Sequence, residues 1–438
     1  MKAIVLAAGE GTRMRPLTFT TPKPLLKITD KSILAHNLEQ LSKVGISEAI
    51  LVVGYLKEKI KQEFGNRYGS MSIVYVEQKE QLGTGDALMQ AESFVDDRFL
   101  VIHGDDLHFA EDMKKCLNHE TAVAAKEVIN PQDFGIFVSD NGFVKDLIEK
   151  PRNPPSNLAN AAIYILNKSI FDFLKRVKKS ERNEIELTDA IKEMSENEKL
   201  HLEIVENWTP LVYPWELLKA MEMMMINLKR NIHSTASVEA NATINGEVVI
   251  GKNSKIKNGV YIEGPVIIGD NSDIGPNCYI RQNTVIGNNC KIGNAVEIKN
   301  SIINDNTKIE HLSYIGDSII ENNCNIGAGT IIANLRHDNK NVKFNVKGEV
   351  VDTGRRKFGA VIASYSKTGI HTSIYPGVHL GPFSWTVPSV AVKENIKPFH
   401  IYDGKLKQIE AKKIDEVIKS DEDKKILINL FEHLKKEE

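Results

Sequence analysis

An aliphatic residue recurs every six positions through much of the second half of this 438-residue chain. The row runs without interruption through Val238, Ile244, Ile250, Ile256, Ile262, Ile268, Ile274, Ile280, Ile286, Ile292 and Ile298, and five-residue steps precede its continuation at Ile303 and Ile320. A period of six matches neither the 3.6-residue repeat of an α-helix nor the two-residue repeat of a strand. It fits a coil of three flat sides, each one hexapeptide long, whose aliphatic residues point inward.

The positions around this row are restricted as well. Glycine often follows the aliphatic residue, as at Gly251, Gly269 and Gly287, and the residue four positions after it is small or β-branched, as at Ser272 and Cys290. A coil of this kind buries its aliphatic row only by stacking on its neighbours. We therefore predict a hexapeptide β-helix and place it at residues 229–394.

The repeat breaks at 335–361, a polar stretch that carries the basic run Arg355, Arg356 and Lys357, and it returns at Ile362. We expect the break to project as a loop from one corner. Residues 395–438 are rich in Lys and Glu, and their apolar residues have helical spacing: Ile426, Leu427, Leu430, Phe431 and Leu434. This tail predicts an amphipathic helix that caps the coil or packs on a subunit, with a partner-binding helix as the alternative.

The first half, residues 1–228, alternates strand-like and helix-like segments. Apolar runs at 2–7, 49–53, 72–76, 99–102 and 122–125 predict strands, and 33–44 and 85–91 predict helices. Strands and helices in series favour a Rossmann-like α/β fold with a mainly parallel sheet and right-handed crossovers. Ligands in such folds bind beyond the carboxyl ends of the strands.

Composition and charge limit the ligands and the cellular location that we expect for this chain. The net charge of −2 provides no general attraction to nucleic acid or to an acidic membrane, so any phosphate must be held by a local site. The start of the chain lacks a signal-peptide pattern, and no run of about 18 apolar residues predicts a membrane span. The four cysteines form no zinc-like spacing, and free thiols suit a reducing compartment. We expect a cytoplasmic protein whose partners are small molecules, not nucleic acid or membrane.

The segment LAAGEGTRM directly follows the first predicted strand. Its small residues, including Gly9, let backbone N–H groups approach a phosphate or a base, although a tight turn explains the glycines equally well. Arg13 adds a guanidinium that can clamp phosphate oxygens. Lys23, between two prolines, adds a second cation, and a solvated loop lysine is the alternative.

LAAGEGTRM and the following PKPLL resemble the signature of sugar-1-phosphate nucleotidylyltransferases. EQKEQLGTGDA at 77–87, HGDDL at 103–107 and the segments DFGIF, LIEKP and SNLANAAIY continue the likeness. Over residues 1–394 the sequence is similar to the archaeal-type bifunctional N-acetylglucosamine-1-phosphate uridyltransferase and glucosamine-1-phosphate N-acetyltransferase family. The resemblance implies a nucleotidyltransferase domain of Rossmann-like α/β fold, followed by a left-handed parallel β-helix that carries the acetyltransferase.

The resemblance also implies UDP-N-acetylglucosamine as product, acetyl-CoA and UTP as co-substrates, and Mg²⁺. It implies that Leu6, Ala8 and Gly9 line the base and ribose, Gln78, Gly83 and Thr84 recognise uracil, Arg13 and Lys23 hold the triphosphate, Asp105 binds the metal, and Gly135, Glu149 and Asn160 hold the sugar. Positioning and charge neutralisation supply the rate of such a phosphoryl transfer, so cations, backbone N–H groups and a carboxylate-held metal are the expected parts. Asp106 is expected to point away into solvent.

Two positions depart from the family pattern. Pro210 stands where a second metal ligand is usual, so Glu206 or Asn207 substitutes for it, the metal has fewer protein ligands, or this half is slow or inactive. Ala162 stands where NAGIY would have glycine, and its methyl group is expected to crowd the sugar pocket.

HLSYIGD at 311–317 and the following NCNIGAGTIIAN resemble the acetyltransferase site of the same family. The likeness implies that His311 is the general base that deprotonates the substrate amine, because an ammonium cannot attack a thioester and an imidazole is suited to remove its proton at neutral pH. It assigns the sugar phosphate to Arg281 and Lys299, and further contacts to Tyr314, Asn325 and Asn334. Arg281 and Lys299 are 18 residues apart, one full coil, so stacking should place them one above the other.

Three readings of function remain open at this point: a bifunctional enzyme, an enzyme with one working half, or a non-catalytic regulatory subunit of this fold. The retained Arg13, Lys23, Asp105 and His311 argue against the last. The choice between UTP and dTTP, and between glucosamine and galactosamine or glucose phosphates, also stays open. The basic run at 355–357 either meets the phosphates of acetyl-CoA or is a solvated loop, and a homotrimer is what the resemblance implies for the assembly.

Overall fold

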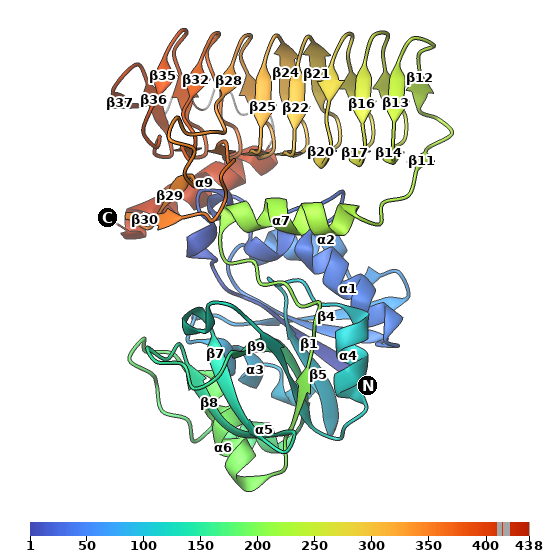
Figure 1. The fold of residues 1–438 in the computed structure, drawn as a ribbon. Helices are drawn as coiled ribbons and strands as arrows, with labels where there is room; N and C mark the ends of the chain where they lie inside the picture. The colour runs from blue at the N-terminus through green and yellow to red at the C-terminus, as the bar shows by residue number, and fades with distance from the viewer. Residues whose placement is uncertain (410–413, 415–420, 438) are drawn as a thin grey trace. The chain divides into compact units, whose positions relative to one another are not determined.

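A computed structural model describes residues 1–409, 414 and 421–437, and it divides into two compact units (Figure 1). The first unit comprises Met1–Glu10, Pro22–Leu26 and Ser32–Leu211, and the second comprises Gly11–Thr21, Lys27–Lys31 and Val212–Glu438. The chain therefore passes between the units four times between residues 10 and 32, before it continues through the body of the first unit.

The first unit is built around a ten-stranded sheet with the order β3-β4-β2-β1-β5-β9-β6-β10-β8-β7. Its strands are β1 (Lys2–Ala7), β2 (Glu48–Val53), β3 (Arg67–Tyr68), β4 (Met71–Glu77), β5 (Arg98–His103), β6 (Ala122–Glu127), β7 (Gly135–Asp140), β8 (Phe143–Glu149), β9 (Leu158–Asn167) and β10 (His201–Ile204). Its helices are α1 (Ile33–Lys43), α2 (Lys57–Phe64), α3 (Thr84–Met89), α4 (Ala110–Leu117), α5 (Ser169–Leu174) and α6 (Leu187–Asn197). The five strands and two helices expected from the sequence are all present.

The sheet is mixed, so the expectation of a mainly parallel sheet was only half right. Strands β1, β2, β4 and β5 are parallel, but β9 runs antiparallel between β5 and β6, and β7 and β8 form a hairpin. The hairpin turns at Asn141 and Gly142, which both have positive φ, and an Asn-Gly pair is a strong short-range signal for such a turn. This signal was in the sequence and was missed.

The second unit is a parallel β-helix, because each coil adds one short strand to each of three sheets. The first sheet contains β11 (Asn231–Ile232), β14 (Val248–Ile250), β17 (Val266–Ile268), β20 (Thr284–Ile286), β23 (Ile302–Ile303), β26 (Ile319–Ile320), β31 (Val361–Ile362) and β33 (His379–Leu380). The second contains β12 (Ser237–Val238), β15 (Lys255–Ile256), β18 (Asp273–Ile274), β21 (Lys291–Asn294), β24 (Lys308–His311) and β27 (Asn325–Ile326). The third contains β13 (Thr243–Asn245), β16 (Tyr261–Glu263), β19 (Tyr279–Ile280), β22 (Glu297–Lys299), β25 (Tyr314–Gly316), β28 (Ile331–Ile332), β32 (Ser373–Ile374) and β35 (Ala391–Val392).

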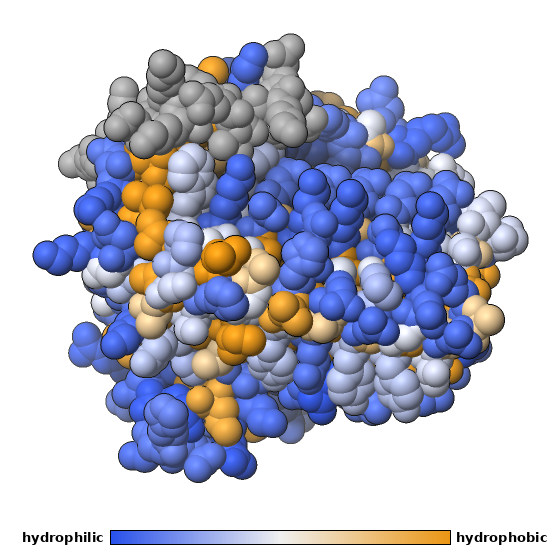
Figure 2. Space-filling view, turned by 90° about the horizontal axis from the view of Figure 1, so that it is seen from above, coloured by the Kyte–Doolittle hydropathy of each residue, from blue (hydrophilic) through white to orange (hydrophobic). Residues whose placement is uncertain are grey.

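The aliphatic row of the sequence becomes three buried columns inside the coil. In the first sheet, for example, Ile250, Ile268 and Ile286 are register partners and lie in one continuous core. The space-filling view shows one face of the molecule, which carries mainly hydrophilic side chains, with hydrophobic residues in small separate spots (Figure 2). Burial of this row therefore holds the stack together, as the period predicts.

The glycines that follow the row serve the turns between the flat sides. A Cβ on Gly251, Gly269 or Gly287 would lie 2.3, 2.5 or 2.4 Å from a side-chain oxygen of the next coil. Those oxygens accept backbone N–H groups of the coil before: the Asp270 carboxylate accepts from Lys252 and the Asn288 amide oxygen accepts from Asp270. The glycines thus leave room for a ladder of turn side chains, which satisfies backbone donors along the coil.

The expected loop at 335–361 contains the hairpin β29 (Lys343–Val346) and β30 (Glu349–Asp352). Phe344 and Phe358 are buried, and Trp215 on α7 (Pro214–Met225) packs edge-on against both. The insertion is therefore folded and has its own apolar contacts, which its overall polarity concealed.

The end of the chain forms α9 (Asp421–Glu437), and the preceding strands are β34 (Trp385–Thr386), β36 (His400–Tyr402) and β37 (Leu406–Gln408). Leu427 and Leu430 of α9 are buried, and Phe431 stacks on Phe399 at a ring separation of 4.2 Å. The helix thus packs on the last coils of its own chain. Among the described residues, every helix falls short of a bilayer span in length or in apolar character.

Candidate active sites

A cavity of about 240 Å³ opens in the first unit beyond the carboxyl ends of β1, β4 and β5. Its lining comes from the ends of these strands, the loops that follow them, α3 and the segment before α6: Leu6, Ala7, Ala8, Gly9, Pro24, Gln78, Gln81, Gly83, Thr84, Ala87, His103, Asp105 and Glu184. The six residues expected to hold the nucleotide and the expected metal ligand are all in this set. Their convergence follows from parallel strands whose carboxyl ends share one edge.

Gln78 has an orientation that its hydrogen bonds define. Its amide nitrogen donates to the Gly83 carbonyl at 2.9 Å and to the Asp86 carboxylate at 2.8 Å. Because both partners only accept, the nitrogen must face them and the amide oxygen is the group left to accept from a ligand. Gly83 itself has φ of 101°, and a Cβ there would lie 2.6 Å from the Ile185 carbonyl oxygen, so only glycine fits.

Lys23 and Asp105 meet at the cavity. The ammonium of Lys23 lies 2.7 Å from Asp105 and 3.8 Å from Asp106. Desolvation raises the pKa of Asp105, but the charge of Lys23 and its hydrogen bond outweigh that effect, and the pKa lies below its ordinary value. Asp105 is therefore a carboxylate at neutral pH, which is the form that a divalent cation or a phosphate-binding cation requires.

Asp106 does not point into solvent, so that expectation was wrong. Its side chain is 13% exposed, and its carboxylate accepts from the Leu211 backbone at 3.0 Å and from the Trp208 indole at 3.3 Å. Asp112, which is fully buried, accepts from the backbone of Asn207 and Trp208. The two aspartates hold the segment around Pro210, because buried backbone donors need acceptors.

Neither proposed substitute for the missing metal ligand lies in the cavity. Asn207 donates its side-chain amide to Asp112 at 3.0 Å, and the Glu206 side chain is 82% exposed beside Lys115. In the described part of the chain, no three His, Cys, Asp or Glu side chains form a metal cluster. The Nε2 atom of His103, a cavity residue, is buried and has no hydrogen-bond partner in the structure. Asp105 and Glu184 are thus the carboxylates in the lining of this cavity, and Asp105 is the one that the resemblance assigns to the metal.

The three expected sugar residues lie outside the lining of this cavity. Gly135 pairs with Glu149 across β7 and β8, and a Cβ on Gly135 would lie 3.0 Å from the Glu149 carboxylate. Asn160 donates to the Tyr164 hydroxyl at 2.7 Å and accepts from the Ala162 backbone at 3.0 Å. Arg13, expected to hold the triphosphate, belongs to the second unit through the segment Gly11–Thr21.

Four of the expected acetyltransferase residues lie on the third sheet or just after its strands: Arg281 after β19, Lys299 on β22, Tyr314 on β25 and Asn334 after β28. Ile280 pairs with Ile298, and Arg281 donates its backbone N–H to the Ile298 carbonyl at 2.8 Å, so Arg281 and Lys299 occupy neighbouring positions on successive coils. The Arg281 guanidinium lies 2.9 Å from Glu297, and the Lys299 ammonium lies 3.4 Å from Asp317. The 18-residue spacing therefore stacks the two cations as expected.

Asp317 is a member of this group that the sequence reasoning missed. It is 2% exposed and accepts from Asn300 at 2.7 Å and from Asn334 at 2.5 Å, while Asn334 also donates to the Tyr314 hydroxyl at 3.1 Å. Burial raises the pKa of Tyr314, so its hydroxyl stays protonated. The sequence offered no distinguishing signal for it, because an aspartate also follows the repeat glycine on another coil, at Gly269-Asp270.

His311 ends β24, on the second sheet, and is exposed. Its neighbour Leu312 has φ of 47° and turns the chain to Tyr314, on the third sheet. His311 is thus at the corner next to the Tyr314 group. Asn325 lies on β27, where it pairs with Lys308, so the structure does not bring it into the hydrogen-bonded group around Asp317.

The basic run at 355–357 is partly engaged. The Arg355 guanidinium lies 2.6 Å from Glu222 on α7, and Arg356 donates to the Asn339 amide oxygen at 2.9 Å. Arg355 holds the insertion against α7 and is therefore not a solvated loop residue. The alternative that this run meets the phosphates of acetyl-CoA stays a prediction.

Comparison with known proteins agrees with this arrangement. A nucleotidyl transferase family model matches residues 2–216, and models described as the GMPPB C-terminal domain and the hexapeptide repeat of succinyl-transferase match 262–358 and 240–263. A "Bifunctional protein GlmU" of Methanocaldococcus jannaschii is 43% identical over 91% of this chain and 96% of its own length. The chain belongs to the bifunctional GlmU family. A "Bifunctional sugar-1-phosphate nucleotidylyltransferase/acetyltransferase" of Sulfurisphaera tokodaii is 42% identical over 90% of the chain and 98% of its own length.

The GlmU family membership confirms the resemblance and the fold class expected from the sequence: an α/β nucleotidyltransferase domain followed by a left-handed hexapeptide β-helix. The chain is an enzyme with a nucleotidyltransferase and an acetyltransferase part. The matches span nearly the whole of these relatives, so neither catalytic part of the family is missing from the chain.

Proposed function

We propose that this enzyme makes UDP-N-acetylglucosamine in two steps. An acetyl group passes from acetyl-CoA to the amine of glucosamine 1-phosphate, and a uridylyl group then passes from UTP to the resulting N-acetylglucosamine 1-phosphate. The observation that carries the proposal is the nearly end-to-end match to relatives named as bifunctional GlmU proteins. The family match does not favour a single working half or a non-catalytic subunit.

In the uridylyl step, a phosphate oxygen of the sugar attacks the α-phosphorus of UTP, and the bond from that phosphorus to pyrophosphate breaks. Arg13 and Lys23 neutralise the triphosphate. Leu6, Ala8 and Gly9 line the base and ribose, and Gln78, Gly83 and Thr84 recognise uracil. Gly135, Glu149 and Asn160 hold the sugar. The Gln78 amide oxygen accepts the N3–H of uracil or thymine, a proton that cytosine lacks, so Gln78 favours UTP or dTTP over CTP.

Asp105 would hold Mg²⁺, which when bound neutralises charge on the phosphates. One carboxylate is a sufficient protein contribution, because Mg²⁺ usually keeps several waters and takes further oxygens from substrate phosphates. This supports the alternative in which the metal has fewer protein ligands, since Glu206 and Asn207 are directed elsewhere.

In the acetyl step, His311 takes a proton from the substrate ammonium, the amine attacks the thioester carbonyl carbon, and the coenzyme A thiol leaves. Arg281 and Lys299 bind the sugar phosphate, and Tyr314, Asn334 and Asn325 make further contacts. Asp317 orients Lys299 and Asn334 through the contacts described above. We also propose a homotrimer, and a cytoplasmic location on the ground of four free cysteines.

Paired assays test both steps on one preparation. Pyrophosphate release is measured with UTP and N-acetylglucosamine 1-phosphate, and thiol release with acetyl-CoA and glucosamine 1-phosphate. We expect Asp105→Ala to abolish only the first activity and His311→Ala to abolish only the second. Absence of pyrophosphate from every nucleotide and sugar pair, or thiol release that survives His311→Ala, would contradict the assignment of the corresponding step.

A further inference from the structure

We infer that Asp305 and Glu321 of the β-helix are positioning residues for uridylyl transfer. They hold residues 11–31, here called the signature segment, which carry Arg13 and Lys23. The inference rests on the proposed uridylyl function. It assigns a role in the first catalytic part to two carboxylates that lie some 280 to 300 residues further along the chain.

The path of the chain is the first observation behind this inference. Gly11–Thr21, with Arg13, and Lys27–Lys31 both belong to the β-helix unit, while Pro22–Leu26, with Lys23, belongs to the first unit. Lys23 therefore sits on a five-residue segment whose two flanking residues, Thr21 and Lys27, are both parts of the other unit. Whatever fixes Thr21 and Lys27 restricts the backbone that presents Lys23.

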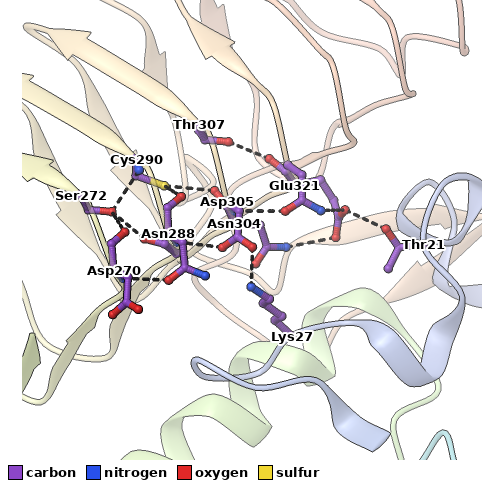
Figure 3. A network of polar contacts seen from close by, with 12 residues as sticks. Thr21, Lys27, Asp270, Ser272, Asn288, Cys290, Asn304, Asp305, Thr307 and Glu321 are labelled. Atoms are coloured by element: carbon purple, nitrogen blue, oxygen red, sulfur yellow. Dashed lines mark hydrogen bonds and ion pairs between the residues drawn. The ribbon is translucent and has the colours of Figure 1, made fainter. Parts of the chain in front are cut away.

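Both flanking residues are bound to carboxylates of the β-helix (Figure 3). The Lys27 ammonium lies 2.6 Å from Asp305, and the Thr21 hydroxyl donates to Glu321 at 3.2 Å. The Glu321 side chain is 1% exposed and also accepts from the Asn304 amide at 3.1 Å. Ser364 donates to the same Glu321 carboxylate at 3.0 Å.

The β-helix repeat changes where these contacts occur. The residue after the aliphatic row is Gly251, Gly269 and Gly287 on three successive coils, but the next two register partners are followed by Asn304 and Glu321. A buried polar pair has therefore replaced the turn glycine on the two coils that bind the signature segment. Coil packing alone does not call for a carboxylate there, because burial of a charge is costly unless it is hydrogen-bonded.

Asp305 likewise has an oxygen that the coil does not use. Its Oδ1 accepts the Asn288 backbone N–H at 2.8 Å as a rung of the turn ladder, and its Oδ2 faces Lys27. Asn288 and Asn322 fill the same kind of rung with a neutral amide oxygen. An asparagine at 305 would keep the rung and remove the ion pair, which separates the two functions of this residue.

Asp305→Asn is the central test, with Asp270→Asn as its matched control. Asp270 is a rung of the same ladder and accepts from the Lys252 backbone, but it belongs to a coil that has Gly269 and Gly287 beside it. We expect Asp305→Asn to lower kcat/KM for pyrophosphate release at least about tenfold, since small misplacements of positioned groups cost that much or more. Thiol release should be unchanged, and Asp270→Asn should leave both activities unchanged.

A double-mutant cycle distinguishes a specific anchor from general weakening. If Lys27 acts through Asp305, the double variant Lys27→Met with Asp305→Asn should have the same kcat/KM for pyrophosphate release as either single variant. Glu321→Gln, which keeps an acceptor oxygen for Thr21, should reduce pyrophosphate release less than Glu321→Ala. Multiplicative losses in the cycle, or equal rates for Asp305→Asn and Asp270→Asn, would overturn the inference.

Hydrogen–deuterium exchange of residues 11–31 gives a readout that does not depend on activity. We expect faster exchange in this segment with Asp305→Asn and not with Asp270→Asn. Unchanged exchange would refute the anchor itself. Faster exchange in an enzyme that releases no pyrophosphate even in its natural form would leave the anchor in place and refute the proposed uridylyl step instead.

Discussion

Ala162 has φ of 52°, a left-handed conformation in which an L residue pays for contact between its Cβ and the backbone. It is 4% exposed on β9, two residues after Asn160, whose side-chain oxygen accepts its backbone N–H. The comparison with a family pattern that has glycine here pointed to a crowded sugar pocket. The structure adds a second consequence, backbone strain, which no reading of side-chain size would have found.

Ala162→Gly should therefore stabilise the first unit. Removal of the Cβ relieves roughly 1–2 kcal/mol of left-handed strain, and the greater freedom of glycine in the unfolded chain takes back part of it, for a net gain of about 0.5–1 kcal/mol. Urea denaturation measures the change. Ala161→Gly, at a fully buried position without positive φ, is the control and should destabilise. Loss of stability in Ala162→Gly would show that the strain argument fails.

The coils of the β-helix could be predicted almost residue by residue, because one period determines burial, register and stacking together. The 18-residue separation of Arg281 and Lys299 is a direct consequence, and the structure has it. The first unit was less predictable. Its strands were identifiable, but the antiparallel insertion of β9 depends on pairings between distant segments, which local periodicity does not encode.

The candidate sites likewise contain residues that the local sequence predicts and residues that depend on distant segments. The residues around the nucleotide cavity follow strand ends and could be located from the sequence. Asp106 and Asp317 could not, because their roles depend on which backbone N–H groups and amides come to lie beside them. Hydrogen bonds between distant segments decide whether an aspartate is a ligand, a solvated residue or a support.

The three cysteines of the β-helix should be inert while the coils are folded. Burial raises the pKa of Cys278 to about 11 and of Cys290 to about 12, so the reactive thiolate is scarce at pH 8. We expect the native protein to react slowly with an aromatic disulfide reagent at pH 8 and the unfolded protein to react rapidly. Rapid reaction of the native protein would show that the coils open readily.

The same shift makes stability depend on pH. The folded pKa of Cys290 lies above its ordinary value of 9.0, so the thiol loses its proton more easily in the unfolded chain. The contribution of this thiol to the free energy of unfolding is therefore complete below pH 9 and is lost as the pH rises toward 12. The free energy of unfolding should fall by up to about 1.4 kcal/mol per pH unit for this thiol. Cys290→Ser isolates the effect, because Ser272 already occupies the corresponding position one coil earlier and serine does not ionise in this range. Equal pH dependence in both proteins would contradict the assignment.

At the scale of the whole molecule, the two units are interleaved along the sequence and are not joined end to end. The sequence suggested a boundary near residue 228, since composition and period change there. The assignment of Gly11–Thr21 and Lys27–Lys31 to the β-helix unit could not be anticipated, because neither segment carries a hexapeptide repeat.

A fragment of residues 1–228 should therefore bind UTP at least about tenfold more weakly than the full chain, a loss of about 1.4 kcal/mol. It lacks Asp305 and Glu321, which hold the signature segment. Isothermal titration with UTP measures the difference, and addition of a separately expressed fragment 229–438 should restore binding. Equal affinity of the fragment and the full chain would show that the signature segment orders itself without the β-helix.

Thr21 and its acceptor Glu321 are 300 residues apart in the sequence, and this separation becomes a delay during synthesis. A ribosome that adds roughly 5–20 residues per second needs roughly 15–60 s to pass from one to the other. The nascent chain must therefore carry its triphosphate-binding segment without its acceptors while β1 and its neighbours emerge. Maturation of the first catalytic part is thus timed by the coils that carry Asp305 and Glu321, and a translation product interrupted before them would hold the nucleotide residues without the means to fix them in place.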